Sequence, residues 1–205
     1  MTPSRRPVGR PVDSDSAETR QALLQAGVAC FAVKGLARTT LREVSVAAGL
    51  TTGTLYHHYR TKEALYIASY VWAVDEMYAE LTRAIVGKTR LEDRLVATLA
   101  ATRRLGRERP ALLNIVLRAW VEHGEAGGEP LPDPPSVGTF VRTLVDDAAN
   151  NGEIEWSDRR RVFNVYRTLG WGMMAIALTG DDHLEHAAAG VRRALRGTMF
   201  KPSKR

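Results

Sequence analysis

Residues 39–59 read TTLREVSVAAGLTTGTLYHHY, and this stretch decides the fold. Thr40 and Glu43 have the spacing of a capping box, in which the threonine hydroxyl and the glutamate carboxylate satisfy each other's backbone amides at a helix start. Gly49 then permits the positive φ of a tight turn between helices. Thr51 can cap a second short helix, from about Thr52 to His58. Two short helices joined by a glycine turn predict a helix-turn-helix.

The second of these helices offers side chains that are suited to reading DNA. In a helix-turn-helix the first helix braces the second, whose N-terminal residues enter the major groove. The alternative is that Thr40 and Thr51 serve only as helix caps, and that Tyr56 or Tyr59 belongs to the core. Short hydroxyl side chains and longer aromatic or imidazole ones can reach phosphates or base edges, and here they are Thr51, Thr52, Thr54, Tyr56, His57 and Tyr59.

The rest of the chain has helical periodicity, without the sustained alternation that is typical of strands. We expect an all-α fold of about nine helices, with an N-terminal three-helix domain that contains the helix-turn-helix and a C-terminal helical bundle. The proline- and glycine-rich stretch at 127–135 is expected to be a loop. Beyond the two short helices, the expected helices cover about 16–34, 62–85, 90–106, 109–123, 136–150, 158–179 and 182–198.

Charge is unevenly divided along the 205 residues, whose formal net charge is +6. Residues 1–62 hold nine Lys or Arg and four Asp or Glu, a net +5, and the remaining residues contribute +1. A basic N-terminal third on a nearly neutral body indicates contact with a polyanion, of which DNA is the commonest. The alternative is a basic segment that is merely solvated.

The overall composition is that of a globular protein with a core, at 44% hydrophobic and 25% charged residues. The longest uncharged apolar stretch, 169–178, is too short to cross a bilayer. The N-terminus leads into no apolar run of the kind found in secretory signals. Cys30 is the sole cysteine, which excludes an intrachain disulfide. We therefore expect a cytoplasmic protein that does not associate with a membrane.

Residues 39–65, which continue the opening stretch with RTKEAL, resemble the DNA-binding domain of the tetracycline-repressor (TetR) family. LLQAG at 23–27 and FAVKG at 31–35 match the family's first helix, so the resemblance spans about residues 16–66. It implies a dimeric repressor. The family often has Tyr-Phe where this chain has His58 and Tyr59, and often Lys or Pro at the position of Thr52. The second departure removes a base or phosphate contact, so the operator preference cannot be carried over.

The resemblance implies a role for each residue of the motif. Thr40 and Lys62 would contact backbone phosphates at its two flanks, and Gly53 would let the second helix approach the DNA closely. Tyr59 would pack beneath that helix. The groove-facing surface would consist of Thr51, Thr52, Thr54, Tyr56 and His57. Upstream, the Gly-Arg-Pro unit around Arg10 can lie extended in a minor groove or can be a solvated tail.

The resemblance also implies a domain organisation: a flexible basic arm at 1–15, the DNA-binding domain at 16–62, a ligand-binding and dimerisation domain at 63–200 and a basic tail at 201–205. The dimer would form through the last two helices. The stretch around Trp171 is apolar on all sides, as in a helix buried between partners. The alternative is an ordinary core helix within one chain. The final helix has an apolar stripe at coiled-coil-like spacing, made of Leu184, Ala188, Val191 and Leu195.

A ligand pocket in the second domain would hold a small molecule, and large apolar side chains indicate a lipophilic or aromatic one. Aromatic and methionine side chains line apolar cavities well, although they fill cores equally well. The candidates are Trp72, Met77, Leu113, Trp120, Phe140, Met173 and Met174.

Enzymatic motifs are missing from the sequence: it has no phosphate-binding glycine loop, no nucleophile elbow and no His-Glu-x-x-His. We expect no cofactor and no metal, because His183 and His186 are better explained as polar residues at a helix start. The expected protein is a repressor that binds a palindromic double-stranded DNA operator as a homodimer and is released by a small-molecule effector. The alternatives are an activator or architectural protein without ligand response, or a helical small-molecule-binding protein or enzyme.

Overall fold

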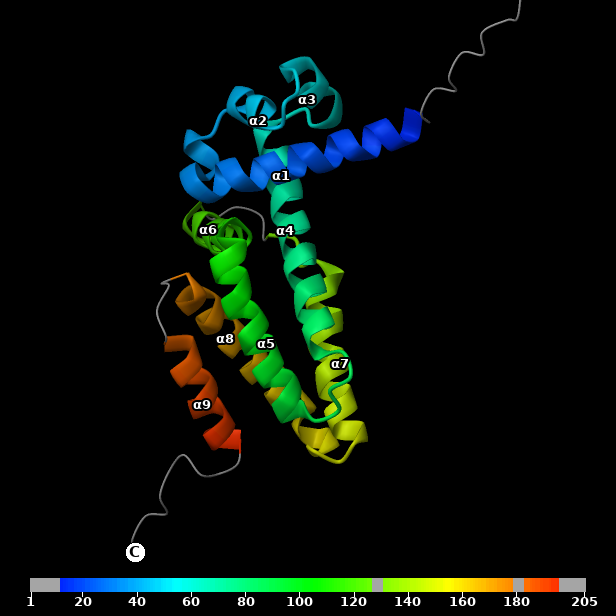
Figure 1. Ribbon diagram of the computed structural model, residues 1–205, viewed down its shortest axis with the longest axis vertical. Helices are drawn as coiled ribbons and strands as arrows, with labels where there is room; N and C mark the ends of the chain where they lie inside the picture. Colours follow the sequence, from blue (N-terminus) through cyan, green and yellow to red (C-terminus); the bar gives the residue numbers. More distant parts are fainter. Residues whose placement is uncertain (1–11, 127–130, 179–182, 196–205) are drawn as a thin grey trace, which may run out of the picture. The chain divides into compact units, whose positions relative to one another are not determined.

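The computed structural model describes residues 12–126, 131–178 and 183–195, and this part of the chain is helical without any strand (Figure 1). The nine α-helices of this part confirm the expected all-α fold. They are α1 (Val12–Arg38), α2 (Leu41–Ala47), α3 (Thr52–His58), α4 (Lys62–Ile85), α5 (Leu91–Glu108), α6 (Pro110–Ala126), α7 (Pro135–Asn150), α8 (Arg159–Ala177) and α9 (His183–Leu195), with a 3₁₀ turn η1 (Trp156–Asp158) before α8.

Two compact units make up the chain, and the division between them falls between Ser69 and Tyr70, inside α4. The boundary that we expected from the sequence, between residues 62 and 63, lies slightly earlier, at the start of α4. The first two turns of α4 therefore pack with the first unit, and the remainder of the helix belongs to the second.

The first unit has a small core to which each of its helices contributes. Leu23 and Phe31 of α1, Val44 of α2, Leu55 of α3 and Leu65 of α4 are all completely buried. The Phe31 ring meets the ring of Tyr66 edge to face, with centroids 5.0 Å apart. An aromatic pair of this geometry adds to the stabilisation from buried area. Burial of Leu55 fixes which face of α3 points inward, and so fixes its outer face too.

The capping residues of α2 and α3 have the expected contacts. The Glu43 amide donates to Thr40 Oγ1 (3.2 Å) and the Thr40 amide donates to Glu43 Oε2 (2.9 Å), which completes the capping box. At the other end of α2, Gly49 has φ 69° and the Leu50 amide donates to the Ser45 carbonyl (2.9 Å). These are the features of a Schellman motif, which turns the chain sharply after a helix.

The start of α1 differs from the expectation, whereas its far end agrees with it. Gly35 has the expected positive φ, 73°, with a non-helical ψ of 177°, so the helix is interrupted there, and a short helical turn follows up to Arg38. The Thr39 hydroxyl then donates to the Gly35 carbonyl (2.7 Å). At the start, α1 begins at Val12, so residues 12–15 are helical and are not part of a flexible arm. Acidic residues at 13 and 15 favour a helix N-terminus electrostatically. Arg10 lies outside the described residues.

The second unit is organised around α5, which packs against α6, α7, α8 and α9 (Figure 1). Its core contains Leu99 of α5, Leu113 of α6 and Leu144 of α7. Gly106 permits α5 and α8 to approach closely, because a Cβ built there would lie 2.4 Å from the carbonyl oxygen of Ala177. None of the helices in the described residues is both long and apolar enough to cross a membrane.

The close approach of α5 and α8 predicts a large effect of one methyl group. We expect Gly106→Ala to lower the free energy of unfolding by about 1–3 kcal/mol, because overpacking outweighs the gain in helix propensity. Gly138→Ala in α7 is the matched control, since the nearest atom to its built Cβ is 3.9 Å away. Urea denaturation should show this control to be neutral or stabilised by up to about 1 kcal/mol. Equal stabilities of the two variants would contradict the close contact.

The capping box predicts an unusually acidic carboxyl group. A hydrogen bond from Lys34 Nζ (2.6 Å), together with those from Thr40, lowers the pKa of Glu43 from 4.5 to about 2. Because the folded pKa is lowered, these contacts stabilise the fold above about pH 4.5 and their contribution is lost as the pH falls toward 2. Lys34→Met should raise the pKa of Glu43, as measured by carboxyl-carbon NMR titration. Lys62→Met, a control without contact to Glu43, should leave it unchanged.

Candidate DNA interface and ligand cavity

The outer face of α3 presents the polar side chains that the sequence indicated. Thr52, Gly53, Tyr56 and His57 are exposed, and Tyr56 keeps 54% of its surface open to solvent. They lie on the outer face of α3, whose inward-facing residue, Leu55, is completely buried in the core. Together they form an exposed surface of hydroxyl, phenol and imidazole groups, which can accept and donate hydrogen bonds to phosphates and base edges.

The threonines that flank this surface have structural contacts as well. Thr51 Oγ1 accepts a hydrogen bond from the Thr54 amide (3.1 Å) and lies 2.9 Å from the Thr54 hydroxyl. Thr40 is exposed and caps α2. The capping roles of Thr40 and Thr51 are therefore visible in the structure, and a DNA contact would be an additional role for the same hydroxyl groups.

Tyr59 lies apart from the other expected DNA-contacting residues. It directly follows α3, only 8% of its surface is exposed, and burial raises the pKa of its hydroxyl. The resemblance implied that it packs beneath α3; the structure shows a buried residue that does not belong to the outer surface of that helix. Its contribution to any DNA contact would be to support the helix.

Basic side chains lie around the motif, and sequence reasoning selected only Lys62 among those of the folded part. Lys62 is half-buried and its Nζ donates to the Ala37 carbonyl (3.3 Å). Lys34 is engaged with Glu43. Arg42 in the first turn of α2 and Arg60 after α3 are exposed, and the sequence-based selection did not include them. Their charge and their positions beside the capping residues were visible in the sequence and would have identified them.

A cavity of about 370 Å³ lies within the second unit. Its walls come from α4, α5, α6, α7 and α8, together with the segment 131–133. Its size is within the range of binding sites for small molecules. Four residues that the sequence selected for a pocket line it: Met77, Trp120, Met173 and Met174.

Three other selected residues do not line the cavity, and their positions on the helices explain why. Leu113 is completely buried one turn before α6 reaches the cavity at Val116. Trp72 lies on the opposite side of α4 from the lining residues. Phe140 is buried behind the wall, where its ring contacts those of Tyr78 and Tyr166, with centroids 5.4 and 6.2 Å away.

Sequence reasoning missed the polar lining of the cavity. Tyr166 donates a hydrogen bond to Thr98 Oγ1 (2.9 Å), and burial raises its pKa. Burial also raises the pKa of Tyr78, to about 12, so these hydroxyl groups are neutral at physiological pH. On α4 the lining residues recur at intervals of three or four, a helical stripe that the sequence contains: Tyr70, Val74, Met77, Tyr78 and Leu81.

Charged residues also line the cavity. Arg167 of α8, Asp133 before α7 and His123 of α6 are among its lining residues. His123 Nδ1 lies 3.2 Å from the Ala119 carbonyl oxygen. Across the described residues, no group of three His, Cys, Asp or Glu side chains is arranged to hold a metal ion.

The residues expected in the dimer interface lie on the last two helices, α8 and α9. Trp171 lines the cavity and its ring packs against that of Trp120, with centroids 4.4 Å apart, so it faces away from the exposed side of α8. Val191 of α9 is half-buried, and the side chains of Leu184, Ala188 and Leu195 lie outside the described part. Instead, α8 itself carries an incompletely buried stripe at heptad spacing, made of Val162, Val165, Leu169, Gly172 and Ile176.

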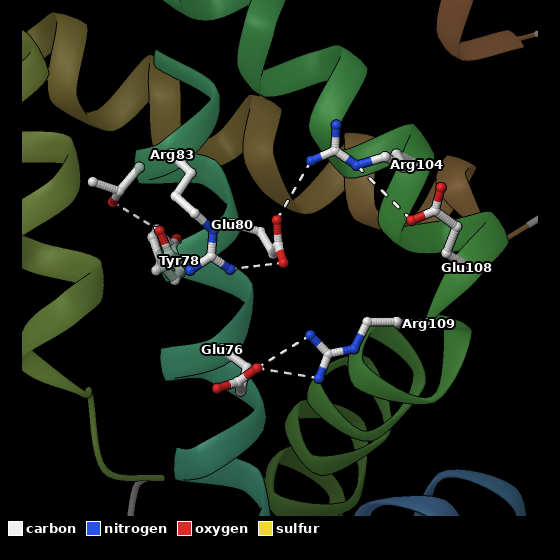
Figure 2. Close-up of polar contacts among 8 residues, drawn as sticks. Glu76, Tyr78, Glu80, Arg83, Arg104, Glu108 and Arg109 are labelled. Atoms are coloured by element: carbon white, nitrogen blue, oxygen red, sulfur yellow. Dashed lines mark hydrogen bonds and ion pairs between the residues drawn. The ribbon is translucent and has the colours of Figure 1, made fainter. Parts of the chain in front are cut away.

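Ion pairs connect α4 to its neighbours within the second unit. Figure 2 shows Glu76 and Glu80 of α4 with the three arginines that they contact. Glu76 Oε2 accepts from both terminal nitrogens of Arg109 (3.1 and 3.2 Å). Glu80 pairs with Arg83 (2.7 Å) and with Arg104 of α5 (3.4 Å). The hydrogen bond from Arg83 is the main reason for the lowered pKa of Glu80.

The helix-turn-helix region is also the part of the chain with recognisable relatives. The sequence profile of bacterial regulatory proteins of the tetR family matches residues 23–68. The transcriptional repressor KstR2 of Mycolicibacterium smegmatis is 42% identical over 52 residues, 25% of this chain and 25% of that protein. The transcriptional regulator AcrR of Shigella flexneri is 32% identical over 85 residues, 42% of this chain and 35% of that protein. The chain thus aligns with about a quarter to a third of the length of these relatives.

Solved structures extend the likeness beyond this region. The fold is similar to that of a TetR-family transcriptional regulator from Rhodococcus sp., with a TM-score of 0.68, 24% identity, and coverage of 90% of this chain and 100% of that one. At this identity the likeness shows the fold alone. The profile match, the named relatives and the capped helix-turn-helix agree, and residues 23–68 are similar to the helix-turn-helix region of the tetR family of bacterial regulatory proteins.

Proposed function

We propose that the protein is a transcriptional regulator that binds DNA through α3. The observation that carries this proposal is a short, capped helix that holds one leucine in the core and directs polar side chains into solvent. Exposed Arg42 and Arg60 beside it can neutralise phosphates. Relatives that align with this region are named as transcriptional repressors or regulators, which supports the same role here.

We propose further that it acts as a dimeric repressor on a palindromic operator. A dimer presents two recognition helices about 34–36 Å apart, which places them in successive major grooves. The stripe on α8 supports a two-fold interface, because Val165 is 57% exposed in the single chain and its helical neighbours in the stripe are apolar or glycine. Burying such a stripe against its own copy removes apolar surface from water.

The cavity supports a role for a small-molecule effector that releases the DNA. Helix α4 lines it with Tyr70, Met77 and Tyr78, and the same helix places Leu65 and Tyr66 in the core of the DNA-binding unit. A ligand that fits one position of α4 better than another shifts the equilibrium between DNA-binding and released states. The ion pairs of Glu76 and Glu80 hold α4 on another side and would define its ligand-free position.

The DNA-binding role predicts the effect of truncating α3. Tyr56→Ala and His57→Ala should each weaken binding to an operator selected from random duplex DNA by about tenfold or more, since one good contact contributes about 1–3 kcal/mol. Both side chains are exposed, so folding should be unaffected. Fluorescence anisotropy of the labelled duplex measures the affinity.

The matched control for this prediction is Arg160→Ala, which changes an exposed residue of the second unit and should bind the operator like the unaltered protein. Unchanged operator affinity of both α3 variants would show that another element reads the DNA.

The dimer predicts that a charge in the α8 stripe separates the subunits. Val165→Glu should give a monomer in sedimentation equilibrium, because a carboxylate buried without a partner is strongly unfavourable. Asn164→Glu introduces the same charge at the neighbouring exposed position, about 100° away around α8, and should leave the dimer intact. A dimer that persists in the Val165 variant would rule out this face as the interface.

A further inference from the structure

One charge in the cavity lacks an ion-pair partner among the residues that the structure describes. Arg167 lines the cavity from α8 and is half-buried, and no carboxylate of that part of the chain lies within ion-pairing distance of it. The guanidinium carbon of Arg167 lies 5.9 Å from the centroid of the Phe163 ring. A guanidinium is always charged, and leaving it unpaired beside apolar walls is unfavourable. A bound anion would offset that cost.

The position of Asp133 is consistent with an anion at Arg167. Asp133 is the carboxylate that lines the described cavity, and it is exposed and makes no ion pair with Arg167. Both charges act on the buried Tyr78, where the effect of Arg167, which lowers the pKa, is larger than that of Asp133, which raises it. At Tyr78 the positive charge of Arg167 therefore acts more strongly than the negative charge of Asp133, which is exposed.

The walls next to Arg167 are aromatic. Trp171 follows Arg167 by four residues on α8, which places the two side chains on neighbouring positions of one helix face. The Trp171 ring packs on that of Trp120, with ring centroids 4.4 Å apart. The cavity has the volume of about a dozen water molecules. It therefore offers an aromatic surface and one cation side by side, in a space that suits a small ligand.

We propose that the effector of this protein is a small aromatic carboxylic acid, whose carboxylate pairs with Arg167 and whose ring packs against Trp171 and Trp120. This inference rests on the proposed function, in that it assigns a chemical class to the ligand of the cavity. Arg167 determines the preference for an anion, because its planar guanidinium can bind a carboxylate through two parallel hydrogen bonds. Asp133 opposes a second negative charge on the ligand, so the preferred acid carries one.

The test compares an acid with its uncharged amide. Biphenylcarboxylic acid and naphthoic acid, each beside its carboxamide, are titrated into the full-length protein by isothermal calorimetry without DNA. At least one acid should bind about tenfold or more tightly than its amide, which is the strength of a charge-assisted hydrogen bond. Equal affinities of acid and amide, or no binding of either acid, would overturn the proposal.

Variants that remove one charge then show which residue causes the preference for the acid over the amide. Arg167→Gln should reduce acid binding about tenfold or more without changing amide binding, and Arg167→Lys should restore part of the preference. Asp133→Asn should strengthen acid binding. Arg160→Gln removes the same charge from an exposed site on the same helix and should change neither ligand. An acid preference that survives Arg167→Gln would place the anion elsewhere and refute the assignment.

Operator binding separates this inference from the proposed function. If the acid binds in an Arg167-dependent way and lowers operator affinity in the anisotropy assay, the ligand class and ligand-controlled release are both supported. If it binds in that way but leaves operator affinity unchanged at saturation, the ligand class stands and ligand-controlled release fails. If no acid preference exists while Tyr56→Ala and His57→Ala still lose the operator, the ligand class fails and the DNA-binding function stands.

Discussion

A single helix, α4, has to satisfy two cores at once, and most of the molecule follows from that constraint. Its first turns place Leu65 and Tyr66 among the buried residues of the first unit. Its later turns place Tyr70 and Met77 along a cavity of the second unit. The helix runs from Lys62 to Ile85, so one helix contributes residues to both units.

One side of α4 carries Glu76 and Glu80 and is held by ion pairs, whereas another side lines the cavity. Walls around an unfilled space lose dispersion contacts that a close-packed core would provide. The arginines from the end of α5 and the residue after it pair with the two glutamates (Figure 2). Exposed ion pairs of this kind each contribute little stability, but as a network they restrict where the helix can lie.

Local features of the fold could be predicted from sequence, because the interactions that decide them are a few residues apart. Thr40 with Glu43 and Gly49 with Leu50 are such cases, and the structure has the expected contacts at each. Gly35 is a third such case, since its positive φ interrupts α1 as expected; the short helical turn after it was not expected.

The cavity depended on tertiary geometry, and there residue type was a poor guide. Trp72 and Trp171 are both large and aromatic. Trp72 was expected in the pocket but lies off the lining face of α4, whereas Trp171 was expected in the dimer interface and lines the cavity. Helical spacing would have done better for α4, because Tyr70, Val74 and Met77 follow one stripe. For Arg167 no local pattern distinguishes a cavity residue from the surface arginines of α8. Only the packing of several helices assigns it.

The packing of Trp120 on Trp171 has a spectroscopic consequence. Their ring centroids are 4.4 Å apart and the rings are tilted by 59°, a geometry in which the electronic transitions of two indoles couple as an exciton. The chain has four tryptophans, and the other two are not among the residues that line the cavity. An exciton couplet in circular dichroism is therefore expected from the cavity wall. It gives the protein an intrinsic optical marker for the state of that wall, without any label and without DNA.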